Sequence, residues 1–400
     1  MKIIHTADWH IGKILHRHDL TEEISMFFNW LETVIVNEKA DVLLISGDVF
    51  DLANPANKDL KLYYHFLHRL AGLKIKIIIT GGNHDSVSLL NAPAELLDTM
   101  NIHVIGGVPE DFEKQIIPIT DERGTVVAVV LAVPFLRDRD LRVSISADQD
   151  KLKTNTLPVA IKSHYDRLVN LSHHQYGKNI PIVAMGHLFM QGAITSDSER
   201  DIHVGSLQGI EVSMVHPDIC YMALGHIHKP QRISKQDHIR YSGSPIYLDF
   251  SEAGYEKMII SVDLCNGAIQ IQPIKIPVFR QLLRLSGNWA TIKDALQNYQ
   301  NPYDLATFVE IDVLEESYNI SVNYEVEAFK DIPNSQYKII KSKIMLPTSA
   351  GIEQVDSATW EATLTPLEMI NKRLESEVMD ESYKGVLISV YGEIIEELID

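Results

Sequence analysis

The sequence has few cysteines and no long apolar run, and both absences narrow the class of protein. Only two cysteines, Cys220 and Cys265, occur among 400 residues, so a disulfide framework is not expected. No uninterrupted apolar stretch reaches the about 18–20 residues that a membrane-spanning helix requires. Asp8 interrupts the N-terminal apolar stretch before it could form the core of a signal peptide. We therefore expect a cytoplasmic protein with no membrane partner.

Basic residues are also scarce, which bears on nucleic-acid binding. The net charge is −18, and phosphate contacts favour basic surfaces. The acidic excess is uneven, because residues 351–400 hold twelve Asp/Glu and three Lys/Arg, a net charge of −9. A site for two metal ions would also use carboxylates while presenting positive charge to a phosphate. The negative net charge of the chain is therefore only weak evidence against a DNA partner.

The length and the strand pattern indicate more than one domain. A single core rarely grows past about 250–300 residues, so 400 residues predict two or three domains. In residues 1–277, short apolar segments alternate with segments of helical periodicity. The predicted strands are Met1–Thr6, Asp41–Ser46, Ile75–Thr80, Thr125–Val133, Ile182–Met185 and Cys220–Leu224, and the predicted helices are Leu20–Lys39 and Leu60–Leu70. This alternation is typical of an α/β fold with helices layered around a central sheet.

A second, smaller domain is predicted over residues 278–346. Before it, the segment from Asp263 to Pro277 resembles a hairpin with Asn266-Gly267 at its turn, and Pro273 and Pro277 suit a boundary. Strand and helix patterns then alternate again, which predicts an α+β domain. Its predicted strands are Gln281–Leu285, Thr307–Val313 and Tyr337–Met345, and its predicted helices lie near Trp289–Tyr299 and Ile320–Lys330.

Residues 347–362 are predicted to be a linker, and residues 363–400 a helical tail. Thr365-Pro366-Leu367-Glu368 combines an N-cap, a proline at the first helical position and a capping-box glutamate. Two amphipathic stripes follow, formed by Leu367, Ile370 and Leu374, and by Leu387, Val390, Tyr391, Ile394 and Leu398. Such stripes pack either on the chain's own body or in a partner's groove, and spacing alone leaves both open.

Five loops at the ends of predicted strands carry the residues suited to metal chemistry. They are Asp8-Trp9-His10, Gly47-Asp48, Gly82-Asn83-His84-Asp85, Gly186-His187 and Gly225-His226-Ile227-His228. Open α/β sheets place their ligand sites at the carboxyl ends of strands. Glycine before a polar residue lets the backbone turn sharply and approach a ligand. Carboxylates, an amide oxygen and imidazoles form a mixed oxygen and nitrogen set that suits Mn²⁺, Fe or Zn²⁺ better than Ca²⁺ or Mg²⁺ alone.

This ordered series resembles the five-motif signature of calcineurin-like metallophosphoesterases. The finer context is similar to the SbcD nuclease family, mainly over residues 1–275. The similar segments are His5-Thr6-Ala7-Asp8-Trp9-His10-Ile11-Gly12, Gly47-Asp48-Val49-Phe50-Asp51, Gly81-Gly82-Asn83-His84-Asp85-Ser86, Val133-Pro134-Phe135-Leu136-Arg137, Ala223-Leu224-Gly225-His226-Ile227-His228 and Tyr241-Ser242-Gly243-Ser244-Pro245-Ile246. The resemblance implies a metallophosphoesterase sandwich of central β-sheets flanked by helices, with a capping domain and a helical tail.

The resemblance also implies a site for two divalent metal ions, with Mn²⁺ preferred, about 3.5–4 Å apart as in other two-metal sites. The first ion would be held by Asp8, His10 and His228, the second by Asn83, His187 and His226, with Asp48 bridging them. His84 would lie beside the scissile phosphate, where it would stabilise the developing charge or protonate the leaving oxygen. Asp85 is expected to orient His84 or to cap the following helix.

The function implied by the resemblance is a Mn²⁺-dependent DNA nuclease acting in repair and recombination. It would be a double-strand exonuclease and a single-strand or hairpin endonuclease. It would form a homodimer through its nuclease domain (residues 1–277) and bind an SbcC-type ATPase through the C-terminal helices. Two alternatives remain open at this stage: a small-molecule phosphodiesterase or phosphatase with the same chemistry, and a non-enzymatic scaffold, because function resides in the site rather than in the fold.

Overall fold

The computed structural model describes residues 1–137, 140, 157–196, 199, 209–265, 268–315, 320–345, 374 and 383–391. These residues form two compact units. The first is Met1–Leu282 with Tyr303–Leu305, and the second is Leu283–Pro302 with the described residues from Ala306 onward. The predicted linker lies outside the described residues, and so does most of the predicted tail, of which residues 374 and 383–391 are helical.

The first unit contains two six-stranded sheets. One has the order β14 (Ala268–Lys275), β13 (Met258–Cys265), β1 (Lys2–Thr6), β4 (Val42–Ser46), β5 (Lys76–Thr80) and β6 (Ile102–Ile105). The other has the order β11 (Gln231–Arg232), β12 (Ile239–Tyr241), β10 (Ile219–Gly225), β9 (Ile182–His187), β8 (Val126–Ala132) and β7 (Ile116–Thr120). Parallel pairing links β1, β4, β5 and β6 in one sheet and β8, β9, β10 and β12 in the other.

The two sheets pack face to face, which confirms the sandwich of central β-sheets that the resemblance implies. Side chains that alternate along a strand point to opposite faces. In β9, Val183 and Met185 join a core cluster with Ile3 and Leu44 of the first sheet, whereas Ile182 and Ala184 join a different cluster. Strands of continuous apolar sequence therefore bury one face against the other sheet and one against helices.

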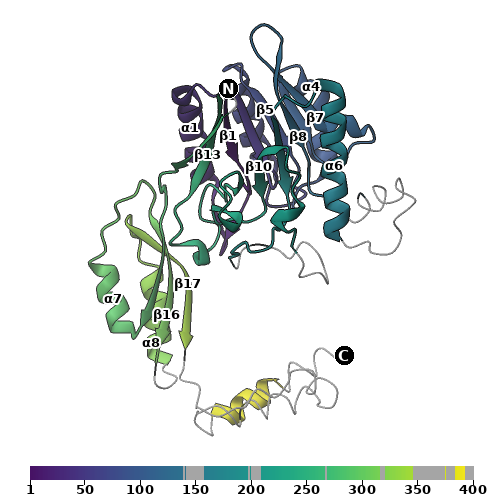
Figure 1. The fold of residues 1–400 in the computed structure, drawn as a ribbon. Coiled ribbons are helices and arrows are strands. Elements are labelled where there is room, and N and C mark those ends of the chain that lie inside the picture. Colours follow the sequence, from purple (N-terminus) through teal and green to yellow (C-terminus); the bar gives the residue numbers. More distant parts are fainter. Residues whose placement is uncertain are drawn as a thin grey trace, which may run out of the picture. The chain divides into compact units, whose positions relative to one another are not determined.

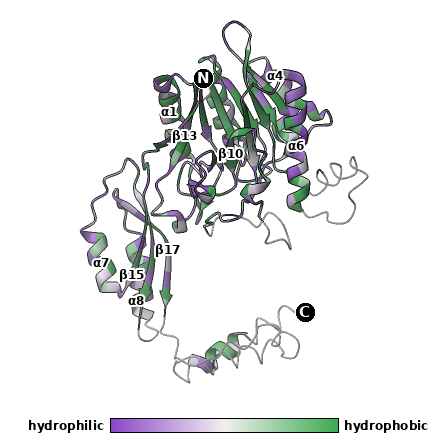
Figure 2. Cartoon of the chain, in the orientation of Figure 1, coloured by the Kyte–Doolittle hydropathy of each residue, from purple (hydrophilic) through white to green (hydrophobic). Residues whose placement is uncertain are grey.

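Helices cover the outer faces of both sheets (Figure 1). On the first sheet, α1 (Thr21–Glu38) and α2 (Asn57–Ala71) bring Phe28 and Phe66 into a stack with ring centroids 4.0 Å apart, against Trp9. On the second, α6 (Leu157–Tyr176) packs through Ile161, Tyr165 and Leu168 among others. Figure 2 shows hydrophobic residues concentrated on the strands, whereas the helices carry both hydrophobic and hydrophilic residues. No described helix is long and apolar enough to cross a membrane.

Shorter elements complete the first unit. They are β2 (Ile14–Leu15), β3 (His18–Asp19), α3 (Val87–Asn91) and α4 (Ala94–Asp98). The predicted hairpin before residue 277 is β13 and β14, which pair antiparallel from Met258↔Lys275 to Cys265↔Ala268. Its predicted turn residues, 266 and 267, lie outside the described residues.

The second unit is a small α+β assembly. A three-stranded sheet has the order β15 (Leu282–Gly287), β16 (Thr307–Leu314) and β17 (Tyr337–Met345), and β16 and β17 are parallel. Two helices, α7 (Trp289–Gln297) and α8 (Ile320–Lys330), lie between the strands in sequence. Their core contains Trp289, Ile292, Val309, Ile311 and Val326 among others. The predicted strands and helices of this segment are thus present, with boundaries shifted by a few residues.

The core between the two sheets yields a test of stability. Leu44 is 0% exposed within this core, so Leu44→Ala removes buried methyl groups and leaves a cavity. We expect the free energy of unfolding to fall by about 2–5 kcal/mol, measured by urea denaturation. The same change at Leu96, which is 67% exposed, should alter it by about 0.5 kcal/mol or less. Equal effects of the two substitutions would contradict the packing of the sheets.

Candidate metal centre

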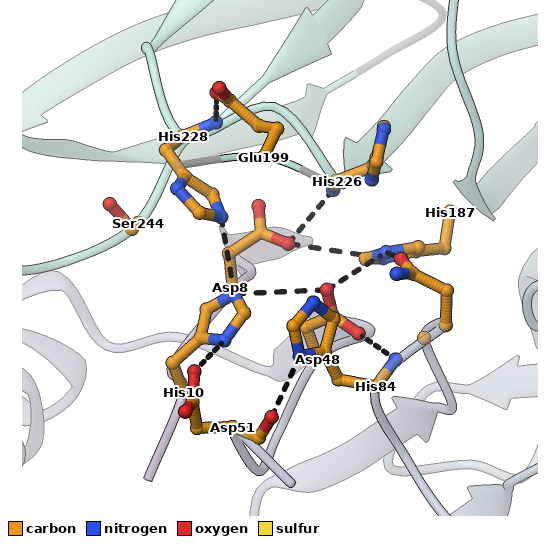
Figure 3. A network of polar contacts seen from close by, with 12 residues as sticks. Asp8, His10, Asp48, Asp51, His84, His187, Glu199, His226, His228 and Ser244 are labelled. Carbon is orange, nitrogen blue, oxygen red and sulfur yellow. Dashed lines mark hydrogen bonds and ion pairs between the residues drawn. The ribbon is translucent and has the colours of Figure 1, made fainter. Parts of the chain in front are cut away.

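The polar residues singled out in the sequence come from strand ends of both sheets and meet at one edge of the sandwich (Figure 3). Asp8 and His10 follow β1, Asp48 follows β4, and Asn83 and His84 follow β5 in the first sheet. His187 ends β9, and His226 and His228 follow β10 in the second sheet. All are buried except Asn83, which is half-buried. The structure therefore brings together all eight residues; their roles in metal binding and catalysis stay predictions.

Glycine allows the loops of the two sheets to approach this closely. A Cβ atom on Gly225, at the end of β10, would overlap the Ser46 carbonyl at the end of β4. A Cβ atom on Gly82 would overlap the carboxylate of Asp48. At the same junction, Ser46 Oγ donates a hydrogen bond to the Ala223 carbonyl at 3.0 Å. Glycine is therefore required at these two positions because a side chain would collide with the neighbouring loop. This requirement holds whether or not a ligand also approaches there.

The backbone at the site is strained. Asp8, His10, Asp48 and His226 all have positive φ, at 53°, 45°, 47° and 101°. Residues other than glycine rarely adopt this region, and such conformations cost about 1–3 kcal/mol each and cluster at functional sites. The first two are held by hydrogen bonds from the Asp8 amide to the Gly47 carbonyl and from the His10 amide to the Asp48 carbonyl, each 3.0 Å long. The strained backbone at four predicted ligands therefore supports the assignment of these residues to a functional site.

Two sets of donor atoms converge, and Asp48 belongs to both. His10, Asp48 and His84 form one group and Asp8, Asp48 and His187 another, with the potential ligand atoms of each group within 4.8 Å of one another. Asp48 Oδ2 lies 3.2 Å from His187 Nε2 and 3.7 Å from His10 Nε2. A carboxylate with oxygens available to both groups is suited to bridge two cations. The predicted bridging role of Asp48 is compatible with this position.

The remaining predicted ligands adjoin these groups. His228 Nε2 lies 3.1 Å from His10 Nε2, and Asn83 Oδ1 lies 2.8 Å from His187 Nε2. The His226 ring is 5.4 Å from the His187 ring, between centroids, and its amide donates to Asp8 Oδ1 at 2.8 Å. The His10–His228, Asn83–His187 and His187–His226 pairs each lie within one predicted ligand set, whereas Asp8, predicted to bind with His10 and His228, is grouped with His187.

Burial and like charge perturb the acid–base properties of the site. Burial, with a smaller effect of Asp48, raises the pKa of Asp8 to about 7. Burial opposes protonation of His187, but the neighbouring Asp48 and Asp8 carboxylates outweigh it and raise its pKa to about 9. Burial likewise opposes ionisation of Asp48, yet His187 and His10 hold its pKa below the usual range. Positive charge on the neighbouring imidazoles therefore stabilises the Asp48 carboxylate, whereas burial leaves the ionised form of Asp8 disfavoured.

The donor chemistry fits divalent metal ions. Among the described residues, the buried Asp8 Oδ2 has no hydrogen-bond partner, and such an atom costs about 1–3 kcal/mol when unsatisfied. Two imidazole nitrogens, those of His10 and His228, face each other at 3.1 Å, and neutral imidazoles offer lone pairs there. Carboxylate oxygens, an amide oxygen and imidazoles together suit Mn²⁺, Fe or Zn²⁺.

His84 and Asp85 occupy distinct places at the end of β5. The His84 side chain is 8% exposed, and its Nδ1 donates a hydrogen bond to the Asp51 carbonyl at 2.7 Å. The expectation that Asp85 orients His84 or caps the following helix is wrong. The Asp85 carboxylate instead accepts hydrogen bonds from the amides of Val49, Phe50 and Gly82, and Ser86 caps α3. Asp85 thus ties the loop after β4 to the loop after β5.

Three groups with no predicted role hold the imidazoles from behind. His187 Nδ1 contacts the Ser46 carbonyl at 3.0 Å, and His10 Nδ1 contacts Asp51 Oδ1 at 3.1 Å. His228 Nδ1 contacts Glu252 Oε1 at 3.0 Å. Asp51 stands three residues after Asp48, within the same motif, and this spacing was the available signal. Nothing in the spacing of Glu252, 24 residues beyond His228, indicates its contact.

Comparison with known proteins shows the family. The model of the calcineurin-like phosphoesterases matches residues 1–230. The SbcD subunit of the nuclease SbcCD from Escherichia coli (strain K12) is 30% identical over 402 residues, which cover 100% of this chain and 98% of that protein. The protein of the same name from Rhodobacter capsulatus is 34% identical over 298 residues, 71% of each chain. That from Bacillus subtilis (strain 168) is 33% identical over 269 residues, 67% of each chain.

These matches agree with the resemblance drawn from the five loops. The family model spans more than half of the chain and includes all of the predicted ligands, from Asp8 to His228. The Escherichia coli protein extends the match over the second unit, because it is aligned along the whole chain. The chain therefore belongs to the calcineurin-like phosphoesterases, as a metal-dependent phosphodiesterase of the SbcD nuclease family.

Proposed function

We propose that this protein is a Mn²⁺-dependent DNA nuclease, with double-strand exonuclease and single-strand or hairpin endonuclease activity. The observation that carries the proposal is the convergence of oxygen and nitrogen donors from both sheets on the shared carboxylate of Asp48. The names of relatives that match along most of the chain support a nucleic-acid substrate. The presence of all seven predicted ligands at one site supports catalysis rather than a scaffold role.

The proposed roles of the residues are those that the family resemblance implies. Asp8, His10 and His228 would hold one cation, Asn83, His187 and His226 would hold the second, and Asp48 would contribute to both positions. Bound divalent cations supply Lewis acidity, which activates water and offsets the negative charge of the phosphoryl oxygens. Strong burial of the ligands strengthens these electrostatic interactions, because the local dielectric constant is low.

His84 is the proposed catalytic residue. Its Nδ1 is engaged with the Asp51 carbonyl, so Nε2 is the ring atom that we assign to the substrate. Its ring lies edge to face with that of His10, with centroids 4.8 Å apart, so it stands beside the metal ligands. From there, with both ring nitrogens protonated, Nε2 donates a hydrogen bond to a phosphoryl oxygen or a proton to the leaving oxygen.

The proposed partners are DNA, a second copy of the chain and an SbcC-type ATPase. The relatives are named as subunits of SbcCD, which supports assembly with the ATPase. The helix at residues 383–391 exposes Tyr383, Val386 and Val390, an apolar set suited to docking on a partner. We place the ATPase contact on these C-terminal helices, the homodimer contact on the nuclease domain, and DNA positioning partly on the second unit as a cap.

Nuclease activity is the first test. The purified chain should cleave linear duplex and hairpin DNA with Mn²⁺, with and without an SbcC-type ATPase, and EDTA should abolish cleavage. Asp48→Ala removes the carboxylate shared by both donor groups. It should therefore weaken Mn²⁺ binding by more than the ~10–100-fold typical of outer contacts and abolish cleavage. Gel electrophoresis of labelled DNA and calorimetric titration of Mn²⁺ measure the two effects.

A contrary result would redirect the assignment. Hydrolysis of bis-nitrophenyl phosphate without any DNA cleavage, even with the ATPase present, would favour a phosphodiesterase acting on small molecules. Absence of Mn²⁺ binding, with no hydrolysis of either substrate, would favour the scaffold hypothesis.

The role of His84 gives a separate prediction. His84→Ala should keep Mn²⁺ binding, because the seven predicted ligands remain, and should lower the cleavage rate by about 10²–10⁴-fold, the contribution typical of a positioned acid or base. His65→Ala is the matched control, because His65 lies on α2 and is exposed, and its rate should stay unchanged. Cleavage at the wild-type rate by His84→Ala would refute the catalytic role of His84. Loss of a bound Mn²⁺ ion from this variant would instead show that His84 is a metal ligand.

A further inference from the structure

One of the predicted metal ligands, His228, is held from behind by a buried carboxylate. The His228 Nδ1–H group donates to Glu252 Oε1 at 3.0 Å, and Glu252 is 0% exposed. With the proton on Nδ1, the lone pair of the imidazole lies on Nε2. That atom faces His10 Nε2 at 3.1 Å, on the side of the site where the cation is proposed. Glu252 therefore selects the tautomer in which His228 can bind a metal ion.

Glu252 is itself fixed by four contacts. Its Oε2 atom accepts hydrogen bonds from Lys257 Nζ at 2.6 Å, from the Leu248 amide at 3.1 Å and from Ser244 Oγ at 3.3 Å. The fourth contact is the one from His228 to Oε1. Hydrogen bonds to both oxygens hold the buried Glu252 carboxylate in one orientation. Its Oε1 atom is therefore kept facing His228.

Lys257 supports the same imidazole in two ways. Its side chain is 3% exposed and its ammonium group forms an ion pair with Glu252. Nζ also donates to the backbone carbonyl of His228 at 3.3 Å and to Ser244 Oγ at 2.6 Å. The lysine thus contacts both the carboxylate behind the ring and the main chain that carries it. These contacts leave the predicted metal-ligating atom of His228, Nε2, untouched.

The opposed imidazole has a similar but more open arrangement. His10 Nδ1 contacts Asp51 Oδ1 at 3.1 Å, and Lys13 Nζ lies 3.3 Å from the same oxygen. The Asp51 side chain is 13% exposed and that of Lys13 is 25% exposed, whereas those of Glu252 and Lys257 are 0% and 3% exposed. The facing pair of imidazoles is therefore backed by one partly accessible and one fully buried carboxylate–lysine pair.

We propose that Glu252 and Lys257 are positioning residues that lock His228 as an Nε2 ligand and so set the affinity of the metal position it serves. The inference rests on the proposed metal site. Outer carboxylates of this kind orient ligating histidines and raise their basicity, and their loss costs about 10–100-fold in metal affinity.

Glu252→Gln is the main test. Because Oε2 meets three donors, the carboxamide oxygen should take that place, which turns the NH₂ group toward His228 Nδ1 and favours the Nε2–H tautomer. Calorimetric titration with Mn²⁺ should then show one of two sites weakened by about 10–100-fold. In the metal-free protein, ¹⁵N-histidine spectra should report the change of tautomer at His228, assigned by comparison with His228→Gln. A purely structural role would not move that signal.

The controls keep the result interpretable. Glu256→Gln makes the same chemical change four residues along, at a side chain that is 64% exposed, and should leave both sites and the spectra unchanged. If Glu252→Gln does not fold, Glu252→Asp keeps the charge beside Lys257 but withdraws the acceptor from His228, so one site should again weaken. Two Mn²⁺ sites of wild-type affinity in a folded Glu252 variant would overturn the inference. Absence of Mn²⁺ binding by the wild-type chain would instead overturn the proposed metal site.

Discussion

Two carboxylates, Asp8 and Asp48, are buried at the junction of two hydrophobic sheets, and the free-energy cost of burying their charges is the constraint on which the site depends. Placing like charges in a low-dielectric setting costs free energy unless positive charge or donors compensate it. The protein surrounds them with imidazoles, of which His187 carries the raised pKa that this environment demands. The arrangement is one that bound cations would stabilise further, so the same electrostatics that make the cluster costly suit it to phosphate chemistry.

The stacking of the sheets makes that cluster possible. Ligand-bearing loops sit at the carboxyl ends of β1, β4 and β5 in one sheet and of β9 and β10 in the other, and the apolar face between the sheets fixes the two sets of ends side by side. The junction leaves little room, as the positions of Gly82 and Gly225 show. Strained backbone at Asp8, His10, Asp48 and His226 follows directly on the buried strands of the two sheets.

Behind the ligands lies a set of acceptors that fix the imidazole rings. The Ser46 carbonyl, Asp51 and Glu252 each face the Nδ1 atom of a different predicted ligand. Asp51 acts twice, because its backbone carbonyl also accepts from His84. Rings held in this way expose Nε2 toward the site, and metal affinity depends on such contacts as well as on the ligands themselves.

The sequence by itself determined the strands, the five loops and the family, because apolar runs and ligand spacing are local properties of the chain. The strands predicted at Asp41–Ser46 and Ile182–Met185, for example, are present, with predicted metal ligands at their ends. The resemblance implied a sandwich of sheets, but only the tertiary structure decided which strand faces meet the other sheet, since a continuously apolar strand is compatible with burial against either a sheet or a helix. Only the tertiary structure placed Asp85 between two loops and Glu252 behind His228. Those contacts join segments separated along the chain, and no periodicity or spacing encodes which carboxylate will meet which imidazole.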